Sequence, residues 1–331
     1  MPPVRCRAFR FALLPILLFI LLLSVSIAQA PHQKTPYWAY VLNPPADLSA
    51  ATPAPVLRHV PNSSASFTFA QTQDYFQVAD WHPAAHPPMP AIVAFGRKPD
   101  VYACAFCHLP NAQGKPENSS LAGLPAAYIL QQMADFKSGI RKSSEPKHVP
   151  VSTMIAKAAA GATADEIQSA ANYFSSLKPR PWIRVIETAT VPKTHPAHFM
   201  LVAIPNSVPE PIGHRIIELA QNPEQTELRD DASGFIAYVP LGSMARGKTL
   251  VTTGSRGLTL PCYTCHGPAL RGLASVPSIA GRSPSYIVRQ FLDMQSGARH
   301  GGANLLMQPV VARLTLDDII AISAYLASLH P

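Results

Sequence analysis

Two five-residue segments with the pattern Cys-x-x-Cys-His carry the clearest chemistry in this chain. They are Cys104–His108 and Cys262–His266, and they begin 158 residues apart. Two cysteines at this spacing can bond to neighbouring vinyl groups on one edge of a porphyrin, and the following histidine then lies under the iron as an axial ligand. The motifs therefore predict two covalently bound haem c groups. The attachment points are Cys104, Cys107, Cys262 and Cys265, and the iron ligands are His108 and His266.

The same spacing also occurs in zinc half-sites and redox dithiols. Three features favour haem here: an export signal, the cysteine count and a repeat around each motif. The chain has five cysteines, of which Cys6 lies in the signal and the other four form the two motifs. An exported protein normally uses its cysteines for structural disulfides. This sequence leaves no cysteine for a structural disulfide, which supports the haem interpretation.

Residues 1–30 resemble a secretory signal. Three arginines precede an apolar run over residues 11–27, and the segment closes on Ala28-Gln29-Ala30, a typical cleavage site. This predicts export across the bacterial inner membrane to the periplasm. The apolar run is also long enough for an uncleaved anchor, which would give membrane association.

The basic charge does not indicate a nucleic-acid partner. Removing residues 1–30 takes away three arginines and no acidic residue, which leaves 24 basic against 19 acidic residues, a formal charge of +5. The propionates of two haems would cancel most of it. We therefore expect redox proteins as donor and acceptor and no nucleic-acid binding.

The similarity between the two halves extends beyond the motifs. The same 158-residue offset relates Gly114 to Gly272, Tyr128 to Tyr286, Asp135 to Asp293 and Arg141 to Arg299. Each stretch predicts a helix that begins at Pro125 or Pro284 and ends at Ser-Gly. Capping patterns at residues 163–166 and 315–318 predict a terminal helix in each copy. Helices before the motifs are expected around 89–97 and 243–252.

This layout resembles the small class I cytochrome c domain, and its tandem arrangement is similar to dihaem cytochromes of the c-four type. The resemblance covers roughly residues 85–180 and 240–331. The expected fold is mainly α, with two class I cytochrome c domains and a small β-containing insertion between them. The predicted divisions are a signal peptide (1–30), an extended N-terminal arm (31–80), cytochrome c domain 1 (81–180), a β-rich segment (181–239) and cytochrome c domain 2 (240–331).

The segments outside the resemblance are predicted to be extended. Four β-prone runs, separated by Pro, Gly and Asn, indicate a small β-element. They cover residues 182–186, 199–204, 216–219 and 234–239. The aromatic stretch 37–41 is expected to pack as an arm over the domains, with either a structural or a partner-docking role.

The repeat also selects candidates for the second axial ligand. Met154 and Met307 correspond between the copies and lie 46 and 41 residues after their motif histidines. Met133 aligns with a phenylalanine, as does Met294, which indicates core packing. His148 and His300 have no histidine counterpart. The class I resemblance implies a distal methionine in this loop, so Met154 and Met307 are the predicted ligands, with gap-filling core methionines as the alternative.

Several residues are expected around the haems. In the family that the chain resembles, the carbonyl of a proline two residues after the histidine accepts the imidazole Nδ1–H, which implies this role for Pro110 and Pro268. Arg141 and Arg299 are candidates to pair with a haem propionate or to lie in solvent. Tyr128 and Tyr286 are expected in the haem pocket or in the helix core.

Histidine and methionine on both irons would leave no coordination position open to a substrate. The prediction is an electron-transfer protein without enzymatic activity. It would transfer single electrons from a donor such as a dehydrogenase to an acceptor such as a terminal oxidase. Two alternatives remain: a dihaem cytochrome c peroxidase, which needs one haem that opens to peroxide, and a haem subunit of a larger oxidoreductase complex.

Overall fold

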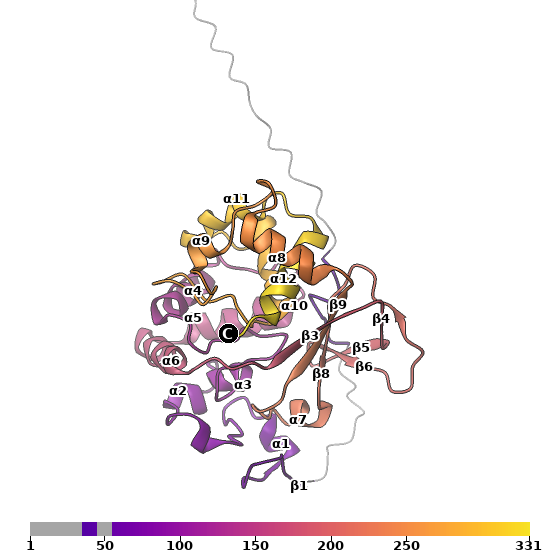
Figure 1. The fold of residues 1–331 in the computed structure, drawn as a ribbon. Helices are drawn as coiled ribbons and strands as arrows, with labels where there is room; N and C mark the ends of the chain where they lie inside the picture. Colours follow the sequence, from indigo (N-terminus) through magenta and orange to yellow (C-terminus); the bar gives the residue numbers. More distant parts are fainter. Residues whose placement is uncertain (1–34, 45–54) are drawn as a thin grey trace, which may run out of the picture. The chain divides into compact units, whose positions relative to one another are not determined.

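The computed structural model describes residues 35–44 and 55–331, and Thr35–Pro331 forms one compact unit. The described residues are largely helical, with short strands between the two copies of the repeat (Figure 1). The predicted signal peptide lies outside the described residues. None of the helices described is both long and apolar enough to cross a bilayer.

Helices form the first copy in the order predicted. They are α2 (Ala91–Ala94), α3 (Cys104–His108), α4 (Ala126–Ser138), the π-helix η2 (Pro150–Ile155), α5 (Ala156–Gly161) and α6 (Ala164–Ser176). α4 ends at Gly139, whose φ of 74° is in the left-handed region that glycine adopts without strain. α6 begins with a capping box in which Thr163 and Glu166 satisfy each other's backbone N–H groups.

α2 is shorter than the predicted helix over residues 89–97. Pro90 lies just before it, and the chain turns at Gly96, whose φ is 63°. A Cβ at Gly96 would collide with the carbonyl oxygen of Val101, so the turn both ends the helix and needs glycine.

The second copy repeats this plan. Its helices are α8 (Ser243–Thr253), α9 (Tyr263–His266), α10 (Pro284–Gln295), the 3-10 helix η3 (Gly302–Met307), α11 (Gln308–Val311) and α12 (Leu316–Ser328). Thr315 and Asp318 form the capping box of α12, as predicted. α8 packs closely on α12 at Gly247, where a Cβ would collide with the carbonyl oxygen of Ala321.

The four β-prone runs each contribute a strand. β3 (Ile183–Thr188), β9 (Phe235–Pro240) and β8 (Ile217–Ala220) form a sheet in that order, with β3 parallel and β8 antiparallel to the central β9. β6 (Met200–Ala203) pairs with β5 (Thr194–Ala197), and β4 (Thr190–Val191) pairs with β7 (Glu210–Pro211). α7 (Pro223–Glu227) lies between β8 and β9.

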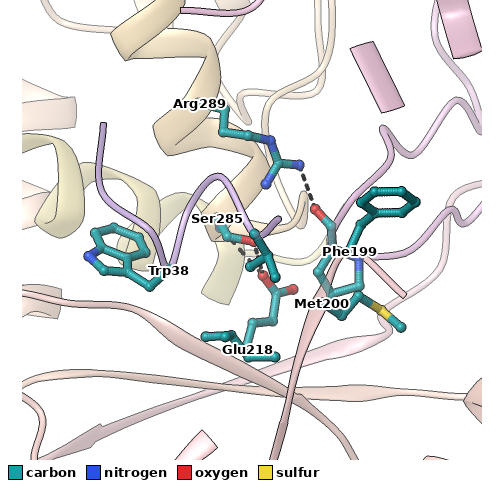
Figure 2. Close-up of a pocket in the computed structure, with 9 residues that line it drawn as sticks. Trp38, Phe199, Met200, Glu218, Ser285 and Arg289 are labelled. Carbon is teal, nitrogen blue, oxygen red and sulfur yellow. Dashed lines mark hydrogen bonds between the residues drawn. The ribbon is translucent and has the colours of Figure 1, made fainter. Parts of the chain in front are cut away.

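The sheet shares its core with the second copy and with the predicted arm. Residues 38–41 are buried in one hydrophobic cluster with Ala237 of β9, Val288 of α10 and Ile322 of α12. Figure 2 shows Trp38 and Arg289 among the residues that line a pocket together with Glu218. Arg289 donates to the carbonyl oxygens of Ala39, at 2.7 Å, and of Pro116 in the first copy, at 2.6 Å. Residues 38–41 of the arm are therefore part of the internal structure.

Residues 55–80 of the predicted extended arm contain short regular elements. These are β1 (Leu57–Arg58), β2 (Phe67–Thr68) and α1 (Phe69–Thr72), and the 3-10 turn η1 (Pro83–Ala85) follows them. Trp81 is buried against Val60 and Leu228, and its indole N–H donates to the Leu228 carbonyl at 2.8 Å. This contact joins the segment before the first motif to the inserted segment.

Candidate functional site

Both motifs are helical and keep free thiols. Cys104 and Cys107 lie in α3, Cys262 caps α9 and Cys265 lies within it, and all four are unpaired. Burial raises the pKa of the Cys104 thiol to about 12 and that of Cys262 to about 11. Redox-active dithiols instead have a thiol pKa lowered by nearby positive charge. Cys104 and Cys262 therefore lack the lowered thiol pKa of a redox-active dithiol.

The motif histidines are held in the same way in both copies. His108 Nδ1 lies 2.9 Å from the Ser119 carbonyl oxygen, and His266 Nδ1 lies 2.8 Å from that of Pro277. With Nδ1 bonded to the backbone, Nε2 is the ring atom left for a metal. Burial lowers the pKa of both imidazoles, which favours the neutral form that coordinates metals.

These bonds correct the roles predicted for Pro110 and Pro268, whose carbonyls do not accept from the imidazoles. The chain reverses directly after each histidine, at Leu109 (φ 64°) and Gly267 (φ 80°), and returns to the ring eleven residues after the histidine. The Pro110 carbonyl instead accepts from the Tyr173 hydroxyl at 2.7 Å. The 158-residue offset relates Ser119 to Pro277, so the two acceptors occupy equivalent positions of the repeat.

The tyrosines and arginines singled out from the sequence meet between the two copies. Arg299 donates to the Tyr128 hydroxyl at 2.9 Å, and Arg141 donates to that of Tyr286 at 3.2 Å. Gln132 accepts from both arginines, at 2.8 Å from Arg141 and 2.9 Å from Arg299. Although burial raises the pKa of Tyr128, the two guanidiniums outweigh it and hold that pKa below its usual value. Each arginine therefore ties its own copy to the other, a role that the sequence did not reveal.

The two candidate distal methionines lie in irregular helices. Met154 is half-buried in the π-helix η2. Met307 is half-buried at the end of η3, where it packs against the hydrophobic cluster that contains Val288 and Ile322. π-Helical turns often occur at functional sites. Met294 is buried in the core, as expected, whereas Met133 is only half-buried. His148 is fully buried, and neither ring nitrogen has a partner among the described residues.

Comparison with known proteins identifies the family. The family model named Cytochrome c matches residues 99–178, in the first copy. Cytochrome c-554(548) of Halomonas halodenitrificans is 37% identical over 68 residues, which cover 20% of this chain and 82% of that protein. The chain belongs to the cytochrome c family.

Other relatives match longer stretches of this cytochrome. Cytochrome c4 of Azotobacter vinelandii is 32% identical over 37% of this chain and 64% of the relative, slightly less than two thirds of its length. A thiosulfate dehydrogenase electron acceptor from Stutzerimonas stutzeri is 26% identical over 70% of this chain and 82% of the relative. The solved structure of reduced cytochrome c4 from Pseudomonas stutzeri has a TM-score of 0.45 at 21% identity and covers 69% of this chain and 93% of its own.

The residues of this cytochrome fit a covalent haem. Each motif supplies two free thiols and a neutral imidazole whose Nδ1 is already fixed, which is the donor set that haem c attachment requires. The Nε atoms of Arg282 and Arg299 are buried without a hydrogen-bond partner among the described residues. Such guanidiniums suit the carboxylate groups of a haem.

The surroundings of the two motifs differ. In the first, Ala105 and Phe106 are 1% and 4% exposed, and Arg229 of the insertion stacks 3.6 Å from the Phe106 ring centroid and donates to the Phe106 carbonyl at 2.8 Å. In the second, Tyr263 is 47% exposed and Cys265 is exposed. The insertion therefore covers the first motif and leaves the second accessible.

Proposed function

We propose that this protein is an exported dihaem cytochrome c that transfers single electrons between a donor such as a dehydrogenase and an acceptor such as a terminal oxidase. The observation that carries the proposal is the repeated motif geometry. Both copies hold the motif histidine through Nδ1 at equivalent positions, beside two free thiols. Haem iron, when bound at such motifs, takes up and releases one electron.

The ligands follow from the repeat. Cys104 and Cys107 would attach one haem, and Cys262 and Cys265 the other. His108 and His266 would coordinate the irons through Nε2. Met154 and Met307 would occupy the opposite positions, and this is supported by their correspondence in the repeat and by their half-buried positions in irregular helices.

The accessible second motif is the proposed point of exchange with a protein partner. Electron transfer between proteins requires a close approach to the redox group, and Arg229 with its neighbours would block such an approach at the first motif. The second motif presents Tyr263, Leu260 at 54% exposure and Leu273 at 59% exposure. Relatives named as thiosulfate dehydrogenase electron acceptors support a dehydrogenase as the donor.

Spectroscopy of the purified protein and its methionine variants tests the ligand assignment. The oxidised wild-type protein should show the weak absorption band at long wavelength that arises from methionine–iron coordination. Met154→Ala and Met307→Ala should each remove half of this band, because each would free one iron. Met133→Ala changes a half-buried methionine that is not a proposed ligand, so it should keep the full band.

Three outcomes would contradict the proposal. A haem content other than two per chain would exclude the dihaem assignment. An unchanged band in either proposed ligand variant would exclude that methionine. Rapid turnover of hydrogen peroxide with a high-spin signal at one haem would replace the carrier with a peroxidase.

A further inference from the structure

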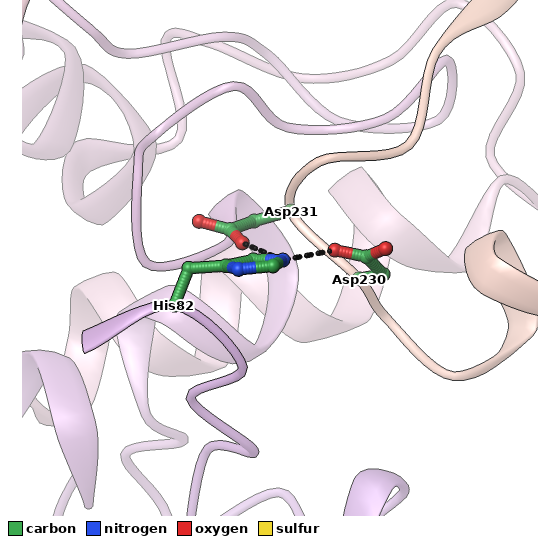
Figure 3. Close-up of side chains that lie close together, drawn as sticks. All are labelled: His82, Asp230 and Asp231. Carbon is green, nitrogen blue, oxygen red and sulfur yellow. Dashed lines mark hydrogen bonds and ion pairs between the residues drawn. The ribbon is translucent and has the colours of Figure 1, made fainter. Parts of the chain in front are cut away.

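A second cluster of metal-ligating side chains lies apart from both motifs. His82 is the residue before η1, and Asp230 and Asp231 lie in the loop between α7 and β9. Figure 3 shows the His82 ring with Nε2 directed between the two carboxylates. The separations are 2.9 Å from Nε2 to Asp230 Oδ1 and 3.9 Å from Nε2 to Asp231 Oδ1.

These separations suit a metal ion. One ligand atom from each of the three residues lies within 4.8 Å of the others. Nitrogen and oxygen ligands about 2.0–2.2 Å from a tetrahedral zinc ion are ~3.3 Å apart. The two measured distances lie on either side of that value, so small side-chain movements would bring all three atoms onto one ion.

One oxygen of each carboxylate lacks a hydrogen-bond partner among the described residues. Asp230 and Asp231 are 1% and 2% exposed, and within the described residues Asp230 Oδ2 and Asp231 Oδ1 accept no hydrogen bond. Adjacent buried carboxylates repel each other and lose hydration, so they need a compensating charge. Burial raises the pKa of Asp231, and His82 and Arg180 only partly oppose this shift. The negative charge of the buried carboxylates is therefore incompletely compensated.

The surrounding charges leave room for a dication. Asp80 lies nearby, where its carboxylate is 3.2 Å from His86 Nε2. Arg180 acts on Asp231 with a permanent positive charge and donates to the Asp231 backbone carbonyl. Asp230 and Asp231 carry two formal negative charges against this single positive charge, so the pair keeps a net negative charge that a cation would offset.

We propose that His82, Asp230 and Asp231 form a binding site for a divalent cation of zinc type. The ligand set of one imidazole and two carboxylates suits zinc, with water completing the coordination. The ion would join the segment before the first motif to the insertion. It would also reach the loop after His108, because Asn111 donates to the Asp231 carbonyl at 2.6 Å. The site would therefore fix the cover over the first motif.

Zinc binding to the haem-loaded protein tests the site. After treatment with EDTA and dialysis against ZnCl₂, elemental analysis should give one zinc per chain beside the haem iron, and titration calorimetry should give one saturable site. His82→Gln and Asp231→Asn should each weaken zinc binding by at least about tenfold. The matched control is His214→Gln, since His214 pairs with Asp317 at 2.7 Å on the surface, where no third ligand is present among the described residues.

The outcomes are decisive in both directions. Zinc lost from both variants and kept in the control supports the site. Absence of saturable zinc binding by the wild-type protein overturns it. Unchanged zinc binding in His82→Gln also overturns it. The haem spectrum reports folding. If Asp231→Asn fails to fold, His82→Gln still decides, because the His82 side chain is 15% exposed whereas that of Asp231 is 3% exposed.

Discussion

At the scale of single residues, burial controls the charge of His148, for which the repeat offers no histidine counterpart. It is fully buried beside Tyr40, with a ring-centroid distance of 5.7 Å. Burial and the nearby Arg289 lower the pKa of His148 to about 3. The folded protein therefore holds this imidazole neutral, whereas the unfolded chain protonates it below about pH 6.5.

His148 should make the fold sensitive to acid. Because its pKa is depressed in the folded state, its contribution to stability is complete above pH 6.5 and is lost as the pH falls from 6.5 toward 3. At pH 5 the loss is on the order of 2 kcal/mol. Denaturant unfolding of wild type and His148→Phe between pH 7 and 5 should give a stability difference that shifts by this amount in favour of the variant. His195→Phe, at an exposed histidine, should follow the wild type; a parallel pH dependence for His148→Phe would refute the assignment.

At the scale of elements, the repeat is held together by close helix contacts. In the second copy α8 crosses α12 at Gly247, where no side chain separates the two backbones. This contact lies in the same core as the sheet and the described arm, so α8 and α12 form the base on which the insertion packs.

Gly247→Ala tests this contact. The added methyl group should increase helix propensity by up to about 1 kcal/mol, yet the collision with the Ala321 carbonyl should destabilise the fold by about 1–3 kcal/mol or more. Thermal unfolding should therefore show a lower midpoint. Lys248→Ala alters the exposed neighbour on the same helix and should have little effect. A midpoint raised by Gly247→Ala would mean that the helices are further apart than the structure shows.

At the scale of the whole molecule, the insertion makes two similar copies unequal. It covers the first motif through Arg229, while the second motif remains exposed around Tyr263. The hydrogen bonds that Arg141 and Arg299 donate to tyrosines of the other copy tie the two copies into one unit. We therefore expect electrons to enter and leave the molecule at the exposed second motif only.

This asymmetry predicts which surface controls the rate. Tyr263→Glu should slow bimolecular reduction by a small reduced cytochrome c several-fold, because a charge placed in the exposed apolar surface costs desolvation when the partner docks. The matched change is Tyr75→Glu. Tyr75 is also exposed, at 42%, and packs 4.4 Å from Phe106 beside the first motif. It should leave the stopped-flow rate unchanged. Equal slowing by both variants, or slowing by Tyr75→Glu alone, would contradict exchange at the second motif.

Local patterns in the sequence were enough to predict many helices and strands of this molecule. The two motifs, the capping boxes at Thr163 and Thr315 and the four β-prone runs all depend on neighbours within a few residues, so their elements form as predicted. The ends of α2 differ from the predicted ones, because the turn that ends this helix at Gly96 is set by a backbone contact with Val101.

Tertiary structure decided how the side chains are used. The partners of His108 and His266, the crossed contacts of Arg141 and Arg299 and the cover of Arg229 over Phe106 all join residues that are distant in sequence or belong to different copies. Such contacts depend on how the chain reverses and which surfaces are buried together, and one sequence does not encode them as a local pattern. The sequence determined the haem motifs, and the packing of the insertion decided which of them is accessible.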